Sequence, residues 1–337
     1  MNFNFFNLTL KPGEKGVTRV KVAEFADGTP ISLTVRALVG KHEGPLFTML
    51  GAQHGDEYNG VAAINRLMDE LEPDKFSGAV IAVPVSNPLA FLTDNYMAPS
   101  SLGYRRLNMN GVWPGNPNGL MTERIAAFIW ENIIKRTDYA LDFHDGGRII
   151  LCRYILAEHI KETDRRVVAQ IEKLYEAFGQ GVPVQLLDHS EHHPKMGALR
   201  RLGALTIQAG LIGVPCIMAE MGGGLHIWEE HVHTAVQGAK NIMINLGMLQ
   251  EEPVGMDLDQ IVSRESAWLR ADQGGILYNN CGLNEVVKEG SRLGIINDIV
   301  GRKLEEINAP FDSVITDIRY QPKVNTGDWL YWCGKIE

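Results

Sequence analysis

Short apolar runs alternate with amphipathic helical segments over most of the chain, and this alternation constrains the fold more than any other feature. Leu46–Leu50 is an apolar run, and apolar residues then recur at helical spacing from Val61 to Leu71. The pattern continues with β-rich runs at Ala79–Val85, Tyr139–Phe143 and Val214–Ala219, and with helical stripes at Ile125–Ile133 and Val167–Phe178. Strands that alternate with helices predict an α/β fold with a mainly parallel or mixed sheet flanked by helices.

The character of the sequence changes near residue 254. From Gly255 onward, short β-rich runs are separated by Gly, Asn and Pro, and no segment has a convincing helical pattern. At the other end of the chain, Val17–Val22 and Ile31–Val39 are predicted strands on either side of a turn. We therefore expect two domains, residues 1–254 with N-terminal strands and an α/β layer, and residues 255–337 as a small all-β barrel or sandwich.

Charge and cysteine content disfavour several classes of protein. Lys+Arg 32 against Asp+Glu 41 gives a formal net charge of -9, which opposes a sequence-independent grip on nucleic-acid phosphates. No apolar run approaches the roughly 20 residues that span a bilayer, and the N-terminus lacks the basic and apolar regions of a signal peptide. The 4 cysteines are scattered, which argues against a disulfide framework or a thiolate zinc site. We expect a cytoplasmic protein that binds neither nucleic acid nor membrane.

Polar side chains stand where three of the predicted strands end. His54 and Glu57 lie in a glycine-flanked turn after the first strand, His144 directly follows Phe143, and Glu220 precedes three glycines. Open α/β sheets place their ligands at the carboxyl ends of strands. Two histidines and one carboxylate are the ligand type of catalytic zinc, and a further carboxylate beside them is a candidate general base.

Each of these positions also has an ordinary structural interpretation, which the residues alone leave open. His54 and Glu57 fit a capped turn, and His144 fits a strand-end residue bonded to local backbone. Glu220 fits a carboxylate that accepts hydrogen bonds from the glycine turn. Together, however, the three strand ends favour a metal centre more than any one of them does.

The ordered set of motifs resembles the succinylglutamate desuccinylase/aspartoacylase family, which are zinc hydrolases with the carboxypeptidase fold. The matching elements, over roughly residues 45 to 225, are Gly-x-x-His-Gly-Asp-Glu, Asn87-Pro88, Pro114-Gly115, Phe143-His144 with a double glycine, and Glu220 before a glycine run. The chain is similar to the branch that deacylates N-acyl amino acids, including acetyl-diaminobutyrate deacetylases. The resemblance implies one zinc ion held by His54, Glu57 and His144, with Glu220 as the catalytic base.

One position departs from the family pattern. The family's Asn-Leu-Asn-Arg-x-Phe-Pro-Gly segment corresponds here to residues 108–115, where Gly111 replaces the arginine that helps to grip the substrate carboxylate. The resemblance places Asn110 of this segment at the substrate. An exposed loop arginine is common, but three nearby arginines are candidate substitutes for the missing guanidinium: Arg105, Arg106 and Arg148.

The resemblance therefore implies a zinc-dependent hydrolase that cleaves the amide bond of a small N-acylated amino acid or related amide. Glu220 would be the general base for a metal-bound water. Two alternatives remain: a metallocarboxypeptidase and a catalytically inactive metabolite-binding homologue. The carboxypeptidase fits less well, because it too requires an arginine at the position of Gly111. Residues 255–337 resemble a biotinyl/lipoyl-type sandwich, but Lys288 is not flanked by methionines, which disfavours a carrier protein. The edges of this all-β tail could support a homo-oligomer.

Other polar groups have less specific patterns. The histidine-rich tract at residues 189–193 has the look of a metal-binding tract, but we expect it to form a loop near the mouth of the site. A second set is spaced i, i+4, i+7, which predicts either a second metal site or an ordinary polar helix face: His226, Glu230 and His233. Asp56 and Asp145 would either orient the ligand histidines or be solvated turn acids.

Overall fold

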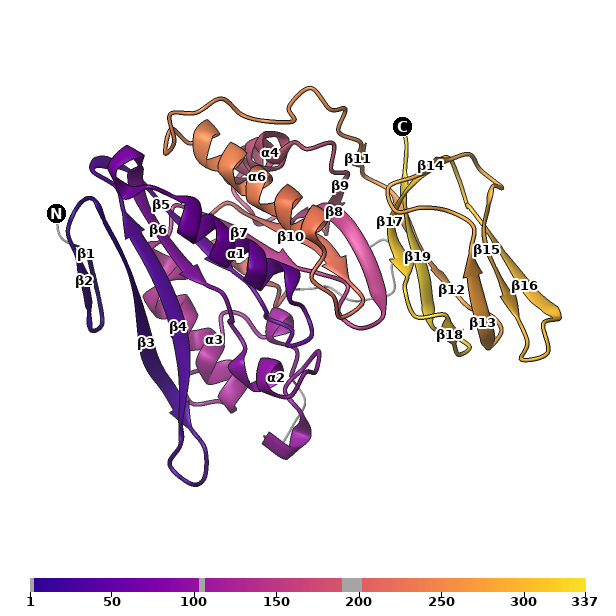
Figure 1. Cartoon of the computed structure of the whole chain (residues 1–337), viewed down its shortest axis with the longest axis horizontal. Helices are drawn as coiled ribbons and strands as arrows, with labels where there is room; N and C mark the ends of the chain where they lie inside the picture. Colours follow the sequence, from indigo (N-terminus) through magenta and orange to yellow (C-terminus); the bar gives the residue numbers. More distant parts are fainter. Residues whose placement is uncertain (1–2, 103–106, 190–201) are drawn as a thin grey trace.

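A mixed sheet runs from the N-terminal strands to the C-terminal strands in the computed structural model, which describes residues 3–102, 107–189 and 202–337 (Figure 1). The strands are β1 (Phe3–Phe5), β2 (Leu8–Leu10), β3 (Glu14–Glu24), β4 (Pro30–Val39), β5 (His42–Leu50), β6 (Ser77–Val83), β7 (Tyr139–His144), β8 (Ile150–His159), β9 (Val184–Asp188), β10 (Cys216–Gly223), β11 (Val262–Ser263), β12 (Ser266–Arg270), β13 (Gly275–Asn279), β14 (Val286–Val287), β15 (Arg292–Asn297), β16 (Lys303–Asn308), β17 (Ser313–Arg319), β18 (Lys323–Val324) and β19 (Trp329–Lys335). The strand order in the large sheet is β12-β19-β17-β8-β10-β7-β5-β6-β4-β3.

The centre of this sheet is parallel and its flanks are antiparallel. Strands β6, β5, β7 and β10 are parallel neighbours. Strands β4 and β3 continue the sheet antiparallel on one side, and β8, β17, β19 and β12 do so on the other. Because parallel strands share a direction, the carboxyl ends of β5, β7 and β10 lie at one edge of the sheet. The predicted mixed α/β sheet is confirmed.

Helices cover both faces of the sheet through apolar stripes. The helices of the described residues are α1 (Asn59–Glu70), α2 (Pro88–Leu92), α3 (Met121–Asn132), α4 (Arg165–Phe178), α5 (Leu205–Leu211) and α6 (Glu229–Asn245), with short 3-10 turns at Pro73–Lys75, Ser100–Leu102, Met109–Gly111 and Ile134–Arg136. Buried residues of α1, α4 and α6 share one apolar cluster, whereas α3 and α5 contribute to a second. Gly179 ends α4 with a φ of 61°, as its position after the apolar stripe predicts. None of the described helices combines the length and apolar character needed to cross a bilayer.

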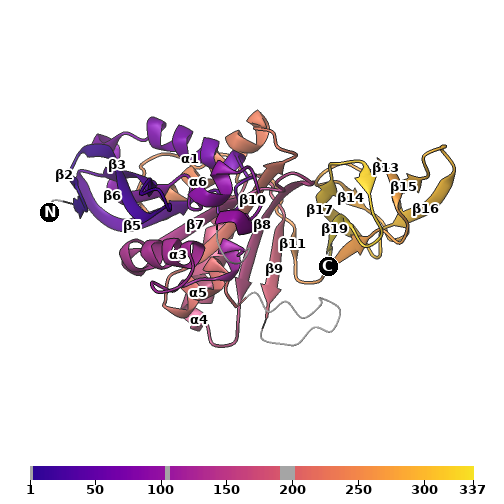
Figure 2. The same ribbon diagram turned by 90° about the horizontal axis from the view of Figure 1, so that it is seen from below.

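The C-terminal strands continue the large sheet through β8 and also build a smaller sheet of their own. Ile150–Cys152 of β8 pair with β17, whereas Ile155–His159 pair with β9. Strands β16, β15, β13 and β18 form a four-stranded sheet, and an apolar cluster that includes Leu293 and Leu330 fills the space beside it. Figure 2 shows these strands as a lobe beside the helix-flanked part of the molecule. All described helices precede Leu246, so the all-β tail is confirmed, while the domain boundary near residue 254 stays a prediction.

Candidate metal centre

Three of the predicted residues meet at the carboxyl edge of the parallel strands. His54 and Glu57 lie in the turn between β5 and α1, and His144 is the last residue of β7. The parallel pairing of β5 with β7 brings these two strand ends together. All three side chains are buried. Within the described part of the chain, they are the one group of three or more His, Cys, Asp or Glu side chains close enough to share a metal ion.

Two imidazole nitrogens and the Glu57 carboxylate converge on one centre. Nδ1 of His54 lies 2.7 Å from Oε1 of Glu57, and Nδ1 of His144 lies 2.9 Å from Oε2. The two Nδ1 atoms are 3.2 Å apart. One potential ligand atom from each residue lies within 4.8 Å of the others.

The far nitrogen of each imidazole faces an oxygen acceptor. Nε2 of His54 lies 2.9 Å from Oδ1 of Asn108, and that oxygen also accepts from the backbone N–H of Asn110, which fixes the orientation of the Asn108 amide. Nε2 of His144 lies 3.1 Å from Oδ2 of Asp142. Both Nε2 atoms therefore carry a proton, and both Nδ1 atoms face Glu57.

This arrangement favours positive charge at its centre. Burial alone would raise the pKa of Glu57, but the charges of His54 and His144 outweigh burial and lower that pKa to about 2. Burial also opposes protonation of His144, yet the carboxylates of Asp142 and Glu57 raise its pKa well above the usual value. A divalent cation would take the place of the imidazole protons at this centre and bind the two Nδ1 atoms and the buried carboxylate together. Two imidazoles and one carboxylate fit the donor preference of zinc.

The proposed base stands on the neighbouring strand. Glu220 of β10 is the register partner of His144 in the parallel pair β10–β7. Paired residues of adjacent strands point to the same face at a spacing of about 4.8 Å, so the Glu220 side chain lies beside His144. On its other side, Sγ of Cys152 lies 3.7 Å from Oε2 of Glu220.

The glycines that follow Glu220 are required by close backbone approaches. Gly222 has a φ of 102° and Gly223 a φ of 133°, which other residues rarely adopt. A Cβ atom at Gly222 would lie 2.5 Å from Nδ2 of Asn59, and one at Gly223 would lie 2.1 Å from the carbonyl oxygen of Ile150. The strand can therefore end next to α1 and β8 without displacing either.

Within the described part of the chain, neither Asp56 nor Asp145 hydrogen-bonds to His54 or His144. Both are buried, so they are not solvated turn acids. Oδ2 of Asp145 accepts from the backbone N–H groups of Tyr58 and Asn59 at the start of α1, and burial raises the pKa of Asp145 to about 7. Asp56 accepts from the backbone N–H of Arg148. The carboxylate that orients a histidine is Asp142, two residues before His144 on the same strand face, a spacing that could have identified it.

The segment that resembles the family's substrate-binding motif packs against the start of α5. Oδ1 of Asn110 accepts from the backbone N–H of Leu205 at 3.1 Å, and its buried Nδ2 has no hydrogen-bond partner among the described residues. A Cβ atom at Gly203 would lie 2.1 Å from the carbonyl oxygen of Gly111. Asn110 therefore keeps an amide donor that a bound molecule could use.

Of the three candidate arginines, only Arg148 lies within the described residues. The guanidinium of Arg148 donates to Asp94 at 3.0 Å and is half exposed. Asp94 also accepts from the hydroxyl of Tyr58. Arg105 and Arg106 lie outside the described residues. Sequence reasoning missed Tyr96, whose ring stacks on His54 with centroids 3.7 Å apart.

The second histidine set does not share a helix face. Helix α6 begins at Glu229, so His226 lies before it, and the i, i+4, i+7 interpretation is wrong for that residue. Of the histidine-rich tract, His189 contacts the buried carboxylate of Glu158 at 2.9 Å. Glu191, His192 and His193 lie outside the described residues.

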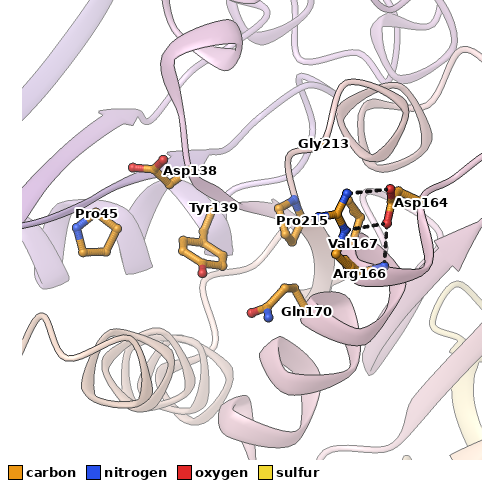
Figure 3. Close-up of a pocket in the computed structure, with 9 residues that line it drawn as sticks. All are labelled: Pro45, Asp138, Tyr139, Asp164, Arg166, Val167, Gln170, Gly213 and Pro215. Atoms are coloured by element: carbon orange, nitrogen blue, oxygen red, sulfur yellow. Dashed lines mark hydrogen bonds and ion pairs between the residues drawn. The ribbon is translucent and has the colours of Figure 1, made fainter.

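An open hollow of about 670 Å³ lies at the opposite edge of the sheet (Figure 3). It is lined by residues at the amino ends of β5, β7 and β10, including Pro45, Tyr139 and Pro215, and by the first turn of α4. The charged side chains drawn there have partners nearby, because Arg166 pairs with Asp164 and Asp138 accepts from the backbone N–H of Leu46. The metal-binding side chains stand at the carboxyl ends of these strands, so the hollow plays no part in their chemistry.

Comparisons with known proteins identify the family of the chain. The family model of the succinylglutamate desuccinylase/aspartoacylase catalytic domain matches residues 43–246. A curated protein of Halomonas elongata, named N-alpha-acetyl-L-2,4-diaminobutyric acid deacetylase, is 26% identical over 298 residues, which are 87% of this chain and 83% of that protein.

Solved structures share the fold over nearly the whole chain. A succinylglutamate desuccinylase from a Silicibacter species superposes with a TM-score of 0.81 at 22% identity, covering 97% of this chain and 96% of that one. The product-bound ectoine utilization protein EutE of Ruegeria pomeroyi superposes with a TM-score of 0.78 at 22% identity, covering 96% of each chain. At these identities the likeness shows that the fold is the same.

Proposed function

This chain belongs to the succinylglutamate desuccinylase/aspartoacylase family, and we propose that it is a zinc-dependent hydrolase that cleaves the amide bond of a small N-acylated amino acid. The family match over residues 43–246 contains every residue of the proposed metal centre and its base. The name of the Halomonas elongata relative supports a deacetylase within this class.

One observation carries the proposal. The Nδ1 atoms of His54 and His144 converge with the Glu57 carboxylate, while Glu220 faces the same side of the sheet on the next strand. A three-residue ligand set leaves room for water and substrate, which is the pattern of catalytic zinc sites, whereas structural sites have four protein ligands.

These positions suggest which part of the reaction each group would carry out. A bound zinc ion supplies a Lewis acid that polarises an amide carbonyl and lowers the pKa of water. His54, Glu57 and His144 would hold the ion. The Glu220 carboxylate would take a proton from the attacking water and deliver it to the departing amine nitrogen. The Cys152 thiol donates to Oε2 of that carboxylate at 3.7 Å.

Substrate contacts are proposed from the same edge of the sheet. The unpartnered Nδ2 of Asn110 supports a role as a donor to substrate. Gly111 has no side chain that could bind a carboxylate. If the substrate carries a free carboxylate, the guanidinium group of an arginine elsewhere in the chain would have to bind it. The candidates are Arg105, Arg106 and Arg148.

Metal analysis tests the ligand assignment. We expect the purified protein to hold about one zinc per chain, and His54→Ala and Glu57→Ala to lose it because each removes one of three protein ligands. Reconstitution with zinc and assay on N-acetyl and N-succinyl amino acids, together with peptides that have free C-termini, would then distinguish a deacylase from a carboxypeptidase. A zinc-loaded protein inactive on the whole panel would support a metabolite-binding homologue.

A charge-neutral substitution tests the base. Glu220→Gln keeps the shape of the side chain but cannot accept a proton, so turnover should fall about 10²–10⁴-fold while zinc content stays at the wild-type level. Glu230→Gln is the control, since that carboxylate is exposed on α6. Wild-type turnover by Glu220→Gln would remove Glu220 from its proposed role.

A further inference from the structure

Four buried side chains form a line of hydrogen bonds that ends on a proposed metal ligand. Nε1 of Trp113 donates to Oε1 of Gln53 at 2.8 Å, and Nε2 of Gln53 donates to Oδ2 of Asp142 at 2.5 Å. The same oxygen of Asp142 faces Nε2 of His144 at 3.1 Å. All four side chains are at most 3% exposed, so water does not compete for these bonds.

The direction of every bond in this line follows from its first member. An indole N–H can only donate, so Gln53 must turn its carbonyl oxygen toward Trp113 and its amino group toward Asp142. Asp142 then accepts from both neighbours, and the proton on His144 must stand on Nε2. That tautomer leaves the Nδ1 lone pair of His144 facing Glu57.

Gln53 is held at its backbone as well as at its side chain. The backbone carbonyl oxygen of Gln53 accepts from Nδ2 of Asn87 at 3.0 Å, and Asn87 stands at the start of α2. Gln53 also directly precedes His54 in the chain. Gln53 therefore connects His54, its neighbour in the chain, to Asp142, the hydrogen-bond partner of His144.

We propose that Trp113 and Gln53 are positioning residues that fix the tautomer and ring orientation of His144 and thereby tighten metal binding. The proposal rests on the metal centre of the proposed function. Oδ1 of Asp142 has no hydrogen-bond partner among the described residues. The bonds to Oδ2 thus offset much of the cost of burying this carboxylate, and loss of the Gln53 donor would leave it held by His144 alone.

The test uses variants that remove hydrogen-bonding groups and keep an apolar side chain at each position. Trp113→Phe deletes the indole N–H, and Gln53→Met deletes both polar atoms of the amide. Trp130→Phe is the matched control, because Trp130 is also buried and packs with Trp113 in the same apolar cluster. Zinc affinity is measured by chelator competition, and the tautomer of His144 by ¹⁵N NMR of the metal-free protein at a pH high enough for the imidazole to be neutral.

We expect zinc affinity to fall about 10-fold in Trp113→Phe and up to about 100-fold in Gln53→Met, with Trp130→Phe within twofold of wild type. In both test variants the His144 signals should show loss of the pure Nε2–H tautomer. The proposal is overturned if the folded Gln53→Met protein keeps wild-type affinity and an unchanged tautomer. A wild-type protein that binds no zinc would instead overturn the metal centre, and the NMR measurement would still decide whether Gln53 and Trp113 set the tautomer.

Discussion

At the scale of single residues, burial makes the cysteine thiols unreactive. Burial raises the pKa of Cys152 and Cys216 well above the usual value, and it raises the pKa of Cys281 and Cys333 to about 12. Only the thiolate attacks an alkylating reagent. We therefore expect iodoacetamide at pH 8 to leave all four thiols of the native protein unlabelled, and to label all four in urea. Intact-protein mass spectrometry measures both, and a native protein alkylated at Cys152 would contradict the burial argument.

Single residues were predictable from the sequence where they stand at strand ends. His54, Glu57 and His144 follow apolar strands, and this local signal with the family resemblance predicted that they form one group, which the structure brings together. Asn108 could not be found in this way, because its contact with His54 joins residues 54 positions apart. Gln53 has the same limitation, since its role depends on Trp113, 60 positions along the chain.

At the scale of elements, the metal centre depends on how closely α1 approaches β7. Gly60 stands in the first turn of α1, where a Cβ atom would lie 2.5 Å from Cβ of Phe143, the neighbour of His144. The glycine therefore sets the distance between the helix that follows Glu57 and the strand that carries His144.

Gly60→Ala should push α1 away from β7. We expect a loss of about 1–3 kcal/mol in the free energy of unfolding from overpacking, together with weaker zinc binding. Gly210→Ala in α5 is the control, because its Cβ would meet Cγ2 of Thr163 at an ordinary 3.4 Å. Urea denaturation and chelator competition measure the two effects, and equal stability in the two variants would show that the close contact at Gly60 does not matter.

Helices and strands whose apolar residues recur with a clear period were predictable from the sequence, and those without such a period were not. Helix α4 has a strong apolar stripe and a glycine stop, and its predicted extent agrees with the structure. Strand β8 is mostly buried on both faces, so its sequence lacks the alternation that identifies a strand. Helix α5 has only seven residues, too few to display a period.

At the scale of the whole molecule, the C-terminal strands are joined to the helix-flanked part by backbone pairing. Asp317 of β17 is the register partner of Cys152 of β8. The sequence pattern changes near residue 254, from alternating strands and helices to short β-rich runs. That pattern could not show which C-terminal strand pairs with which earlier strand. That pairing depends on contacts between residues more than 150 positions apart, which local patterns do not encode.

The junction between the two parts contains a carboxyl group that favours its neutral form. Burial, followed by the charge of Glu220, raises the pKa of Asp317 well above the usual value. The folded protein therefore binds this proton more tightly than the unfolded chain does. Below the unfolded pKa of about 3.9 both states are protonated, and as pH rises above it the folded state loses stability until the folded pKa is passed.

Asp317→Asn should remove this loss, because a carboxamide resembles a protonated carboxyl group in shape and does not titrate. The variant should gain stability over wild type as pH rises from 4 to 8, by about 1.4 kcal/mol for each tenfold difference in proton affinity between the folded and unfolded states. Asp312→Asn gives the opposite direction below about pH 4, because the hydrogen bond from Lys288 lowers the pKa of Asp312 and wild type loses that stabilisation as the carboxylate is protonated. Urea denaturation of the three proteins from about pH 3 to 8 measures both trends. A stability difference between Asp317→Asn and wild type that stays constant with pH would mean that Asp317 is ionised in the folded protein, and that the junction tolerates a buried charge.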